Sequence, residues 1–226
     1  KAATAAGIRS VVHVSAIGAN AESNAAYARS KARGEAAIRE AAPDTIIFRP
    51  SIVFGPEDGF FNRFAAMARI MPVLPLIGAE TKFQPVFVGD VATAIADALD
   101  GKAKAGTTYE LGGPEVATFR DLVAYICDLT GRKRLLAPLP FAAGRAMALV
   151  TEIASKVSLG LFPAMLTTTR DQVEMLRTDN VVSDAAKAEG RTLEAFGIAP
   201  ESFRAIAPTY LWRYRATGQY DSRKLA

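Results

Sequence analysis

The 226-residue sequence contains one cysteine and one histidine, and this scarcity excludes several classes of protein. A single cysteine, Cys127, forms no intrachain disulfide and supplies no cysteine-based zinc cluster. His13 stands among valines without a neighbouring carboxylate, so we expect a structural side chain and no metal site. No run of about 18 uncharged apolar residues occurs, so we expect no transmembrane helix.

The charge is nearly balanced, with 27 basic and 23 acidic residues and a formal net charge of +4. No dense block of lysine and arginine stands outside the C-terminal tail, so nucleic acid is not an expected partner. Half of the residues are hydrophobic, which is ample for a packed core.

The first seven residues predict the last turns of a helix that Gly7 ends. They contain no initiator methionine and no apolar stretch of the kind that signal peptides have. We therefore expect an N-terminal part of the protein to precede them.

Strands and helices are predicted to alternate through the first half of the chain. The expected strands are residues 8–15, 45–49, 83–88 and 107–111, and the expected helices are 24–41, 60–71, 89–99 and 118–131. We interpret Pro72–Gly78 as a connection. This alternation predicts an α/β fold with a parallel sheet, whereas helices dominate the later residues.

The pattern Tyr27-x-x-x-Lys31 follows the apolar run at residues 11–15. On a helix, positions i and i+4 lie on one face. Both side chains would point to the carboxyl end of the preceding strand, where open α/β sheets bind nucleotides. The lysine charge favours the phenolate, and the ammonium group can also hydrogen-bond a ribose. The pair predicts a nucleotide site with an acid/base tyrosine.

Further segments extend this pattern along the chain. They are Val14-Ser15, Phe48-Arg49-Pro50-Ser51-Ile52-Val53-Phe54-Gly55-Pro56, Gln84-Pro85-Val86-Phe87-Val88-Gly89-Asp90-Val91-Ala92 and Tyr109-Glu110-Leu111-Gly112-Gly113. In this order and spacing, the chain resembles the extended and atypical short-chain dehydrogenase/reductases, which are NAD(P)-binding epimerase/dehydratase-like proteins. Two later segments, 196–200 and 210–220, are similar to those of the NADPH-binding accessory subunits of respiratory complex I and their bacterial relatives.

The resemblance implies a division of the chain. Residues 1–131 would form the C-terminal part of a Rossmann-type doubly wound parallel sheet, with segments of a substrate lobe interleaved. Residues 132–214 would form a smaller, mostly helical second lobe, and residues 215–226 a polar, basic tail. The N-terminal strands and the Gly-rich phosphate loop of such a fold are missing from this sequence.

The resemblance also implies roles for individual residues. Tyr27 matches the active-site tyrosine, and Lys31 matches the partner that holds the nicotinamide ribose. The implied cofactor contacts are Ser15, Ala16, Tyr27, Lys31, Pro50, Ser51, Ile52 and Val53. The expected cofactor is NADP(H), and NAD(H) stays open because the residue that selects between them is not in this sequence.

One position departs from the active members of the family. They usually carry a hydroxyl residue at the position of Ala16, where it helps to polarise the substrate. Ser15 is adjacent, but neighbouring residues on a strand point to opposite faces, so Ser15 is a poor substitute unless the strand ends before it. A role in binding without turnover therefore fits this chain better than catalysis does.

Three other polar residues keep two interpretations each. Arg49 pairs with a carboxylate or lines the substrate cleft. Gln84 faces the cleft or packs within its strand. Asp90 is expected to cap the helix that follows it, with any contact to substrate secondary.

Two segments are candidates for docking. The uncharged segment 157–166 is too short to span a bilayer, so it packs within its lobe or docks on a partner or membrane surface. The tail, residues 201–226, mixes arginines with aromatic residues, which is typical of protein interfaces and of membrane-surface contacts. A plain solvated terminus is the alternative.

Two functions follow from these features. The first is an NADPH-binding accessory subunit of respiratory complex I, peripheral on the cytoplasmic side of the bacterial inner membrane or the mitochondrial matrix side. The second is a free-standing NAD(P)-dependent epimerase, dehydratase or reductase that acts on a nucleotide sugar or a similar hydroxyl or carbonyl compound and is soluble in the cytoplasm.

Overall fold

The computed structural model describes residues 2–8, 10–158, 163 and 166–218. The chain folds into two compact units, each built from three separate stretches of sequence. Unit 1 comprises residues 1–53, 83–116 and 178–203. Unit 2 comprises residues 54–82, 117–177 and 204–226.

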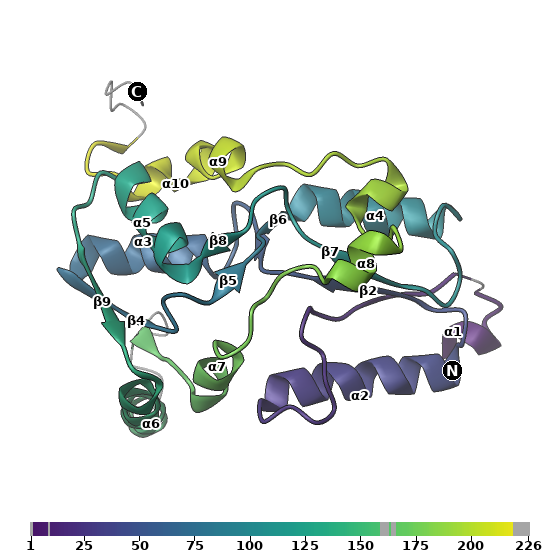
Figure 1. Ribbon diagram of the computed structural model, residues 1–226, viewed down its shortest axis with the longest axis horizontal. Coiled ribbons are helices and arrows are strands. Elements are labelled where there is room, and N and C mark those ends of the chain that lie inside the picture. The colour runs from purple at the N-terminus through teal and green to yellow at the C-terminus, as the bar shows by residue number, and fades with distance from the viewer. Residues whose placement is uncertain (1, 9, 159–162, 164–165, 219–226) are drawn as a thin grey trace. The chain divides into compact units, whose positions relative to one another are not determined.

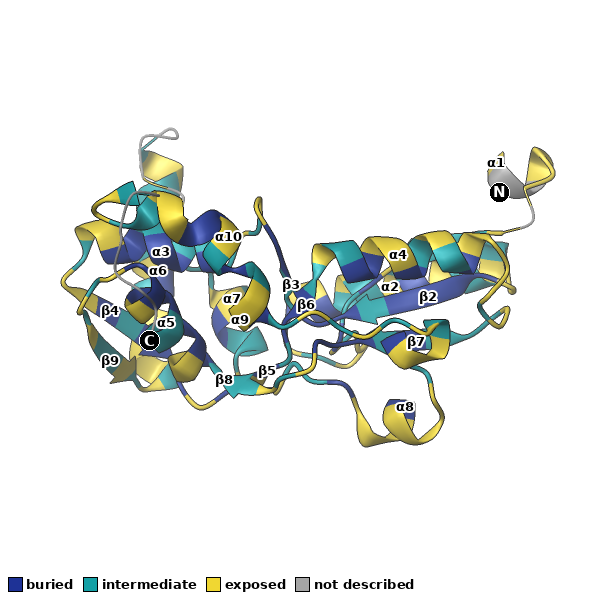
Figure 2. Ribbon diagram, turned by 90° about the horizontal axis from the view of Figure 1, so that it is seen from above, coloured by how far each residue is buried: buried dark blue, intermediate teal, exposed yellow. Residues whose placement is uncertain are grey.

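Unit 1 contains a parallel sheet of three strands in the order β1-β2-β7. The strands are β1 (Val12–Val14), β2 (Ile46–Pro50) and β7 (Thr108–Leu111). The middle strand β2 is almost entirely buried, as its dark blue ribbon in Figure 2 shows. A strand buried on both faces needs a continuous apolar run, and Ile46, Ile47 and Phe48 supply it. The predicted α/β fold with a parallel sheet is confirmed.

Two helices cover opposite faces of this sheet (Figure 1). They are α2 (Ala26–Ala41) and α4 (Val88–Leu99). The smaller elements of the unit are α1 (Ala2–Ala5), β6 (Val86–Phe87), α8 (Asp184–Ala188) and the 3-10 helix η2 (Leu193–Phe196). The core between the sheet, α4 and η2 consists of Ile46, Phe48, Val86, Val91, Ala94, Ala98, Tyr109, Leu111 and Leu193.

Unit 2 is built on two helices and a parallel pair of strands. The helices α3 (Phe61–Ile70) and α5 (Phe119–Leu129) pack through a cluster of phenylalanine rings. Strands β4 (Val73–Ile77) and β9 (Leu135–Leu139) pair in parallel, and β9 leads into the long helix α6 (Phe141–Val157). Helix α7 (Arg170–Met175), helix α10 (Pro208–Leu211) and the 3-10 helix η3 (Trp212–Tyr214) complete the unit.

The remaining elements are short. They are β3 (Val53–Phe54), β5 (Lys82–Phe83), β8 (Ala117–Thr118) and α9 (Phe203–Ile206). No helix among the described residues is both long and apolar enough to span a bilayer.

Two local predictions from the sequence were wrong. The stretch Pro72–Gly78 contains strand β4 rather than a simple connection. In a two-stranded ladder each strand has an open edge, so a proline that lacks an N–H is tolerated there. Asp90 does not cap its helix, because α4 begins at Val88. Its carboxylate instead accepts a hydrogen bond from the backbone N–H of Glu201, at 2.8 Å.

Candidate nucleotide site

The carboxyl ends of β1 and β2 lie side by side at one edge of the sheet. The N–H of Ser15 donates to the carbonyl of Phe48 at 2.7 Å, and the N–H of Ile17 donates to the carbonyl of Pro50 at 3.0 Å. These bonds continue the pairing beyond the last residue of β1. They bring Ser15 and Ala16 next to the loop that begins at Pro50, as the sequence predicted for the carboxyl end of a parallel sheet.

Helix α2 carries Tyr27 in its first turn and Lys31 one turn later. The Lys31 ammonium lies 5.6 Å from the centre of the Tyr27 ring, so the two side chains share a face of the helix. Tyr27 is 45% exposed. Burial of the rest of the side chain raises the pKa of the Tyr27 phenol, the opposite of what the lysine charge alone predicts. The phenol is therefore protonated at neutral pH.

Glu35 stands one turn beyond Lys31 and ties α2 to the sheet. Its carboxylate accepts hydrogen bonds from Arg49 of β2, at 2.8 Å from Nε and 2.7 Å from Nη2. Burial works to raise the pKa of Glu35, but the hydrogen bonds and the charge of Arg49 leave that pKa lowered. Of the two interpretations of Arg49, pairing with a carboxylate is confirmed.

The position of Ser15 bears on whether its hydroxyl replaces the one that Ala16 lacks. Ser15 directly follows the last residue of β1 and is buried, and its hydroxyl has no hydrogen-bond partner among the described residues. Because the strand ends before Ser15, the alternation of faces along a strand does not exclude this hydroxyl from the site. An unpaired hydroxyl thus stands next to Ala16 at this strand end.

The loop after β2 is held by a distant segment of the same unit. The Ser51 hydroxyl lies 2.7 Å from the side-chain oxygen of Asn180 and 2.8 Å from its carbonyl oxygen. It also accepts a hydrogen bond from the backbone N–H of Gln84, at 3.2 Å. The Asn180 amide in turn donates to the carbonyl of Ile17, at 3.3 Å. Asn180 therefore bridges the ends of β1 and β2.

Gln84 packs within this network. Its Nε2 donates to the carbonyl of Gly113 at 2.8 Å, and its Oε1 accepts from the N–H of Val182 at 3.0 Å. Both ends of the amide are occupied by backbone groups. This arrangement confirms the packing interpretation of Gln84.

The side chain of His13, a residue of β1, lies between this strand and α2. A methyl group at Gly34 of α2 would be 3.5 Å from its Nε2 atom, so the ring sits directly under the helix. Among the described residues, no group of three or more histidine, cysteine, aspartate or glutamate side chains is arranged to hold a metal ion.

The sequence alone did not indicate Glu35 or Asn180. Glu35 continues the helical spacing of Tyr27 and Lys31, so its place on that face could have been found from the i+4 rule. Asn180 stands 129 residues from Ser51, and no local pattern links the two.

Several known proteins are similar to this chain. The family model described as the RmlD substrate binding domain matches residues 19–152. The chain is 36% identical over 215 residues to "NADH dehydrogenase [ubiquinone] 1 alpha subcomplex subunit 9, mitochondrial" of Arabidopsis thaliana, which covers 94% of this chain and 52% of that protein. It is also 36% identical over 95 residues to a ceramide reductase of Caulobacter vibrioides, covering 42% of this chain and 30% of that one.

A solved structure has the same fold. It is the dTDP-glucose 4,6-dehydratase of Bacillus anthracis in complex with NAD, with a TM-score of 0.61 and 16% sequence identity. The match covers 94% of this chain and 64% of that one. The chain spans about half the length of the curated relatives that it matches over most of its own length.

Proposed function

Because the chain belongs to the NAD-dependent epimerase/dehydratase-like short-chain dehydrogenase/reductases, we propose that it binds NADP(H) as an accessory subunit of respiratory complex I. It has little or no turnover of its own in this role. NAD(H) is the second choice of cofactor. The observation that carries the proposal is the pairing of Tyr27 and Lys31 on one face of α2, together with Ala16, which has no hydroxyl, after the end of β1.

The side chains around the pair suit a nicotinamide nucleotide, which supplies hydride chemistry when bound. The Lys31 ammonium is a donor for the ribose hydroxyls, and the protonated Tyr27 phenol is a donor for a carbonyl. Ala16 is small and leaves space at the strand end. The residues that would line the nicotinamide ring are Ser15, Ala16, Pro50, Ser51, Ile52 and Val53. No G-x-G-x-x-G phosphate loop occurs in this sequence, so these residues would hold the nicotinamide half of the cofactor.

The loss of the hydroxyl at Ala16 argues against efficient catalysis. Removing one donor from the group that stabilises a developing oxyanion costs on the order of 10²–10³ in rate. A bound nucleotide still stabilises the folded protein, by RT ln(1 + [L]/Kd), without any turnover.

The proposed partners are subunits of respiratory complex I and the membrane surface that surrounds them. The similarity to the Arabidopsis subunit extends over 94% of this chain. The corresponding location is peripheral, on the cytoplasmic side of a bacterial inner membrane or the matrix side of the mitochondrial one.

The test is gentle purification of the whole protein from membranes, with bound nucleotides and accompanying proteins identified by mass spectrometry. We expect NADPH together with respiratory-complex subunits. Recovery of the protein with neither NADPH nor respiratory-complex subunits would refute the proposal. The variant Lys31→Met should lose the nucleotide, whereas Arg33→Met, on the exposed part of the same helix, should keep it.

A free-standing epimerase, dehydratase or reductase is the second candidate. The intact Tyr27–Lys31 pair favours it, as does the partial similarity to the ceramide reductase. The same purified protein, assayed for NADPH oxidation with carbonyl compounds, separates the two functions. Turnover that Tyr27→Phe abolishes would make Tyr27 a catalytic acid and would favour the reductase.

A further inference from the structure

Helix α6 packs on its unit through its smallest residues. Gly144 and Ala148 are its buried positions. A methyl group at Gly144 would lie 2.8 Å from side-chain atoms of Ile77, so only glycine permits this close approach. Ala148, Ile77 and Val173 form the local core between α6, β4 and α7. Phe141 and Met147 of α6 add partly buried apolar surface to this core.

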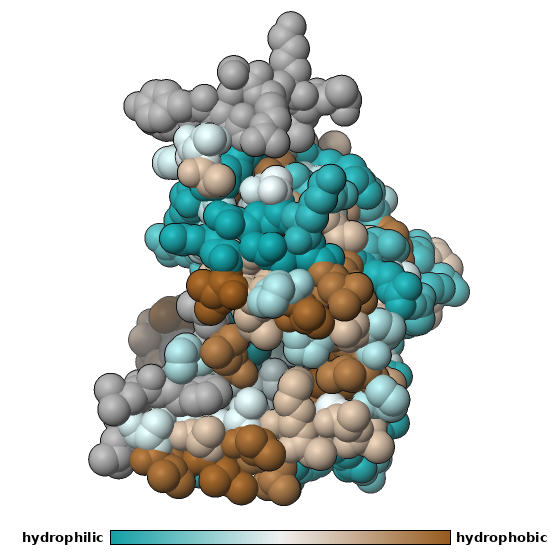
Figure 3. Space-filling model, turned by 90° about the vertical axis from the view of Figure 1, so that its left-hand side faces the viewer, coloured by the Kyte–Doolittle hydropathy of each residue, from teal (hydrophilic) through white to brown (hydrophobic). Residues whose placement is uncertain are grey.

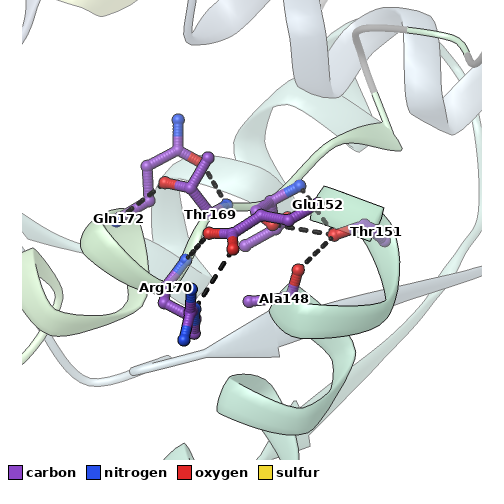
Figure 4. Close-up of polar contacts among 7 residues, drawn as sticks. Ala148, Thr151, Glu152, Thr169, Arg170 and Gln172 are labelled. Carbon is purple, nitrogen blue, oxygen red and sulfur yellow. Dashed lines mark hydrogen bonds and ion pairs between the residues drawn. The ribbon is translucent and has the colours of Figure 1, made fainter. Parts of the chain in front are cut away.

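Two polar side chains of α6, those of Thr151 and Glu152, also face the protein (Figure 4). The Thr151 hydroxyl lies 2.7 Å from the carbonyl oxygen of Thr168. The Glu152 carboxylate accepts from the backbone N–H of Arg170 at 2.7 Å and from its side-chain Nε at 3.1 Å. Polar groups on a surface helix usually point to water. Here they attach the helix to the segment that leads into α7.

The large apolar side chains of α6 point outward instead. Leu149 is 43% exposed, Val150 65%, Ile153 53% and Val157 76%. Their spacing of one, three and four residues places them on one face of the helix. Hydrophobic surface gathers along the lower edge of the view in Figure 3, where α6 lies. The face of α6 that carries these four side chains points away from the unit, and packing within the unit leaves it uncovered.

We propose that this outward face of α6 docks on the surface of an anionic lipid bilayer, with the helix lying in the interfacial plane. A helix that binds in this way combines an apolar face with basic residues beside it. The only charged residues of α6 are Arg145, Glu152 and Lys156, and Glu152 is neutralised by its ion pair with Arg170. Arg145 is exposed but lies 3.7 Å from the Glu174 carboxylate, so Lys156 is the exposed charge of α6 that remains to attract anionic headgroups.

A second copy of the chain fits this face less well. Two such faces would bring like charges, one Lys156 from each copy, to the same contact. Stable dimers also bury about 800 Å² on each partner, more than four side chains of one helix offer. The docking segment expected from the sequence, residues 157–166, lies mostly outside the described residues, and the exposed face stands immediately before it.

The experiment is flotation of the whole purified protein with vesicles of phosphatidylcholine, with and without phosphatidylglycerol. We expect binding to the vesicles that contain phosphatidylglycerol. Val150→Glu should weaken this binding at least about tenfold, because it puts a charge at the interface. Lys156→Gln should weaken it about fivefold, and only when the anionic lipid is present.

The matched control is Val116→Glu, which makes the same change at a valine of unit 1 that is 52% exposed. It should bind vesicles as the unaltered protein does. The proposal would be overturned if the protein did not float with the vesicles, or if both glutamate variants lost vesicle binding equally. It would also be overturned by a concentration-dependent dimer that Val150→Glu abolishes while flotation is unchanged. The inference rests on the proposed function only for its setting at a respiratory membrane. The assay contains no nucleotide and no respiratory complex, so its failure would leave nucleotide binding untouched.

Discussion

The variant Arg49→Met tests how α2 is held against the sheet. Glu35 is only 7% exposed, and Arg49 supplies two of its hydrogen bonds and its counter-charge. Removing one partner of a buried pair costs about 3–5 kcal/mol. The Arg49 side chain is 28% exposed, so solvent screens part of this interaction. We therefore expect the free energy of unfolding to fall by about 2–4 kcal/mol at neutral pH.

The expected loss also depends on pH. The folded-state pKa of Glu35 is lowered, so the pair contributes stability above the unfolded pKa of about 4.3. That contribution disappears as the pH falls through the folded pKa. The difference in the free energy of unfolding between Arg49→Met and the unaltered protein should therefore be largest at pH 7 and decrease under acid conditions.

Urea unfolding followed by circular dichroism measures this difference. The control is Arg33→Met on the exposed side of α2, for which we expect a change within about 0.5 kcal/mol. The double variant Glu35→Gln with Arg49→Met should recover part of the loss, because no buried charge then lacks a partner. An Arg49→Met protein as stable as Arg33→Met, or equally destabilised at every pH, would refute the role given to the pair.

Three further changes test other parts of the fold by urea unfolding. Thr118→Ala removes the side-chain cap of α5 and should cost about 1 kcal/mol; a protein with unchanged stability would show that the cap contributes nothing. Tyr210→Phe removes the hydroxyl that donates to Asp58 at 2.8 Å and should cost about 1–3 kcal/mol, and an effect below 0.5 kcal/mol would contradict it. Gly144→Ala forces α6 away from Ile77 and should cost about 1–3 kcal/mol, whereas a stabilised protein would contradict the close approach.

The sequence predicted regular elements best where a period was clear and the ends were marked. The expected helix 60–71 is α3, and the expected helix 118–131 is α5, which a capping box at Thr118 begins. Strand β4 was missed because two prolines and a glycine in Pro72–Gly78 outweighed its apolar residues. Pairing with β9, more than fifty residues away, makes this stretch a strand, and local propensity does not contain that information.

The candidate site shows the same division between local and distant information. Helical spacing alone predicts that Tyr27 and Lys31 lie on one face of their helix, and this shared face is confirmed. The Arg49–Glu35 pair needed the packing of α2 on β2, which the sequence only suggested through the charge of Arg49. The outward orientation of the apolar face of α6 could not be predicted, because an apolar period favours burial of that face.

The most direct test of the central claim is a titration of the whole protein with NADPH, followed by the fluorescence of the nucleotide. The account predicts saturable binding that Lys31→Met weakens at least about tenfold, since a charged hydrogen bond to the ribose is lost. Arg33→Met should bind as the unaltered protein does. Binding that is absent, or that Lys31→Met and Arg33→Met leave equally strong, would contradict the account.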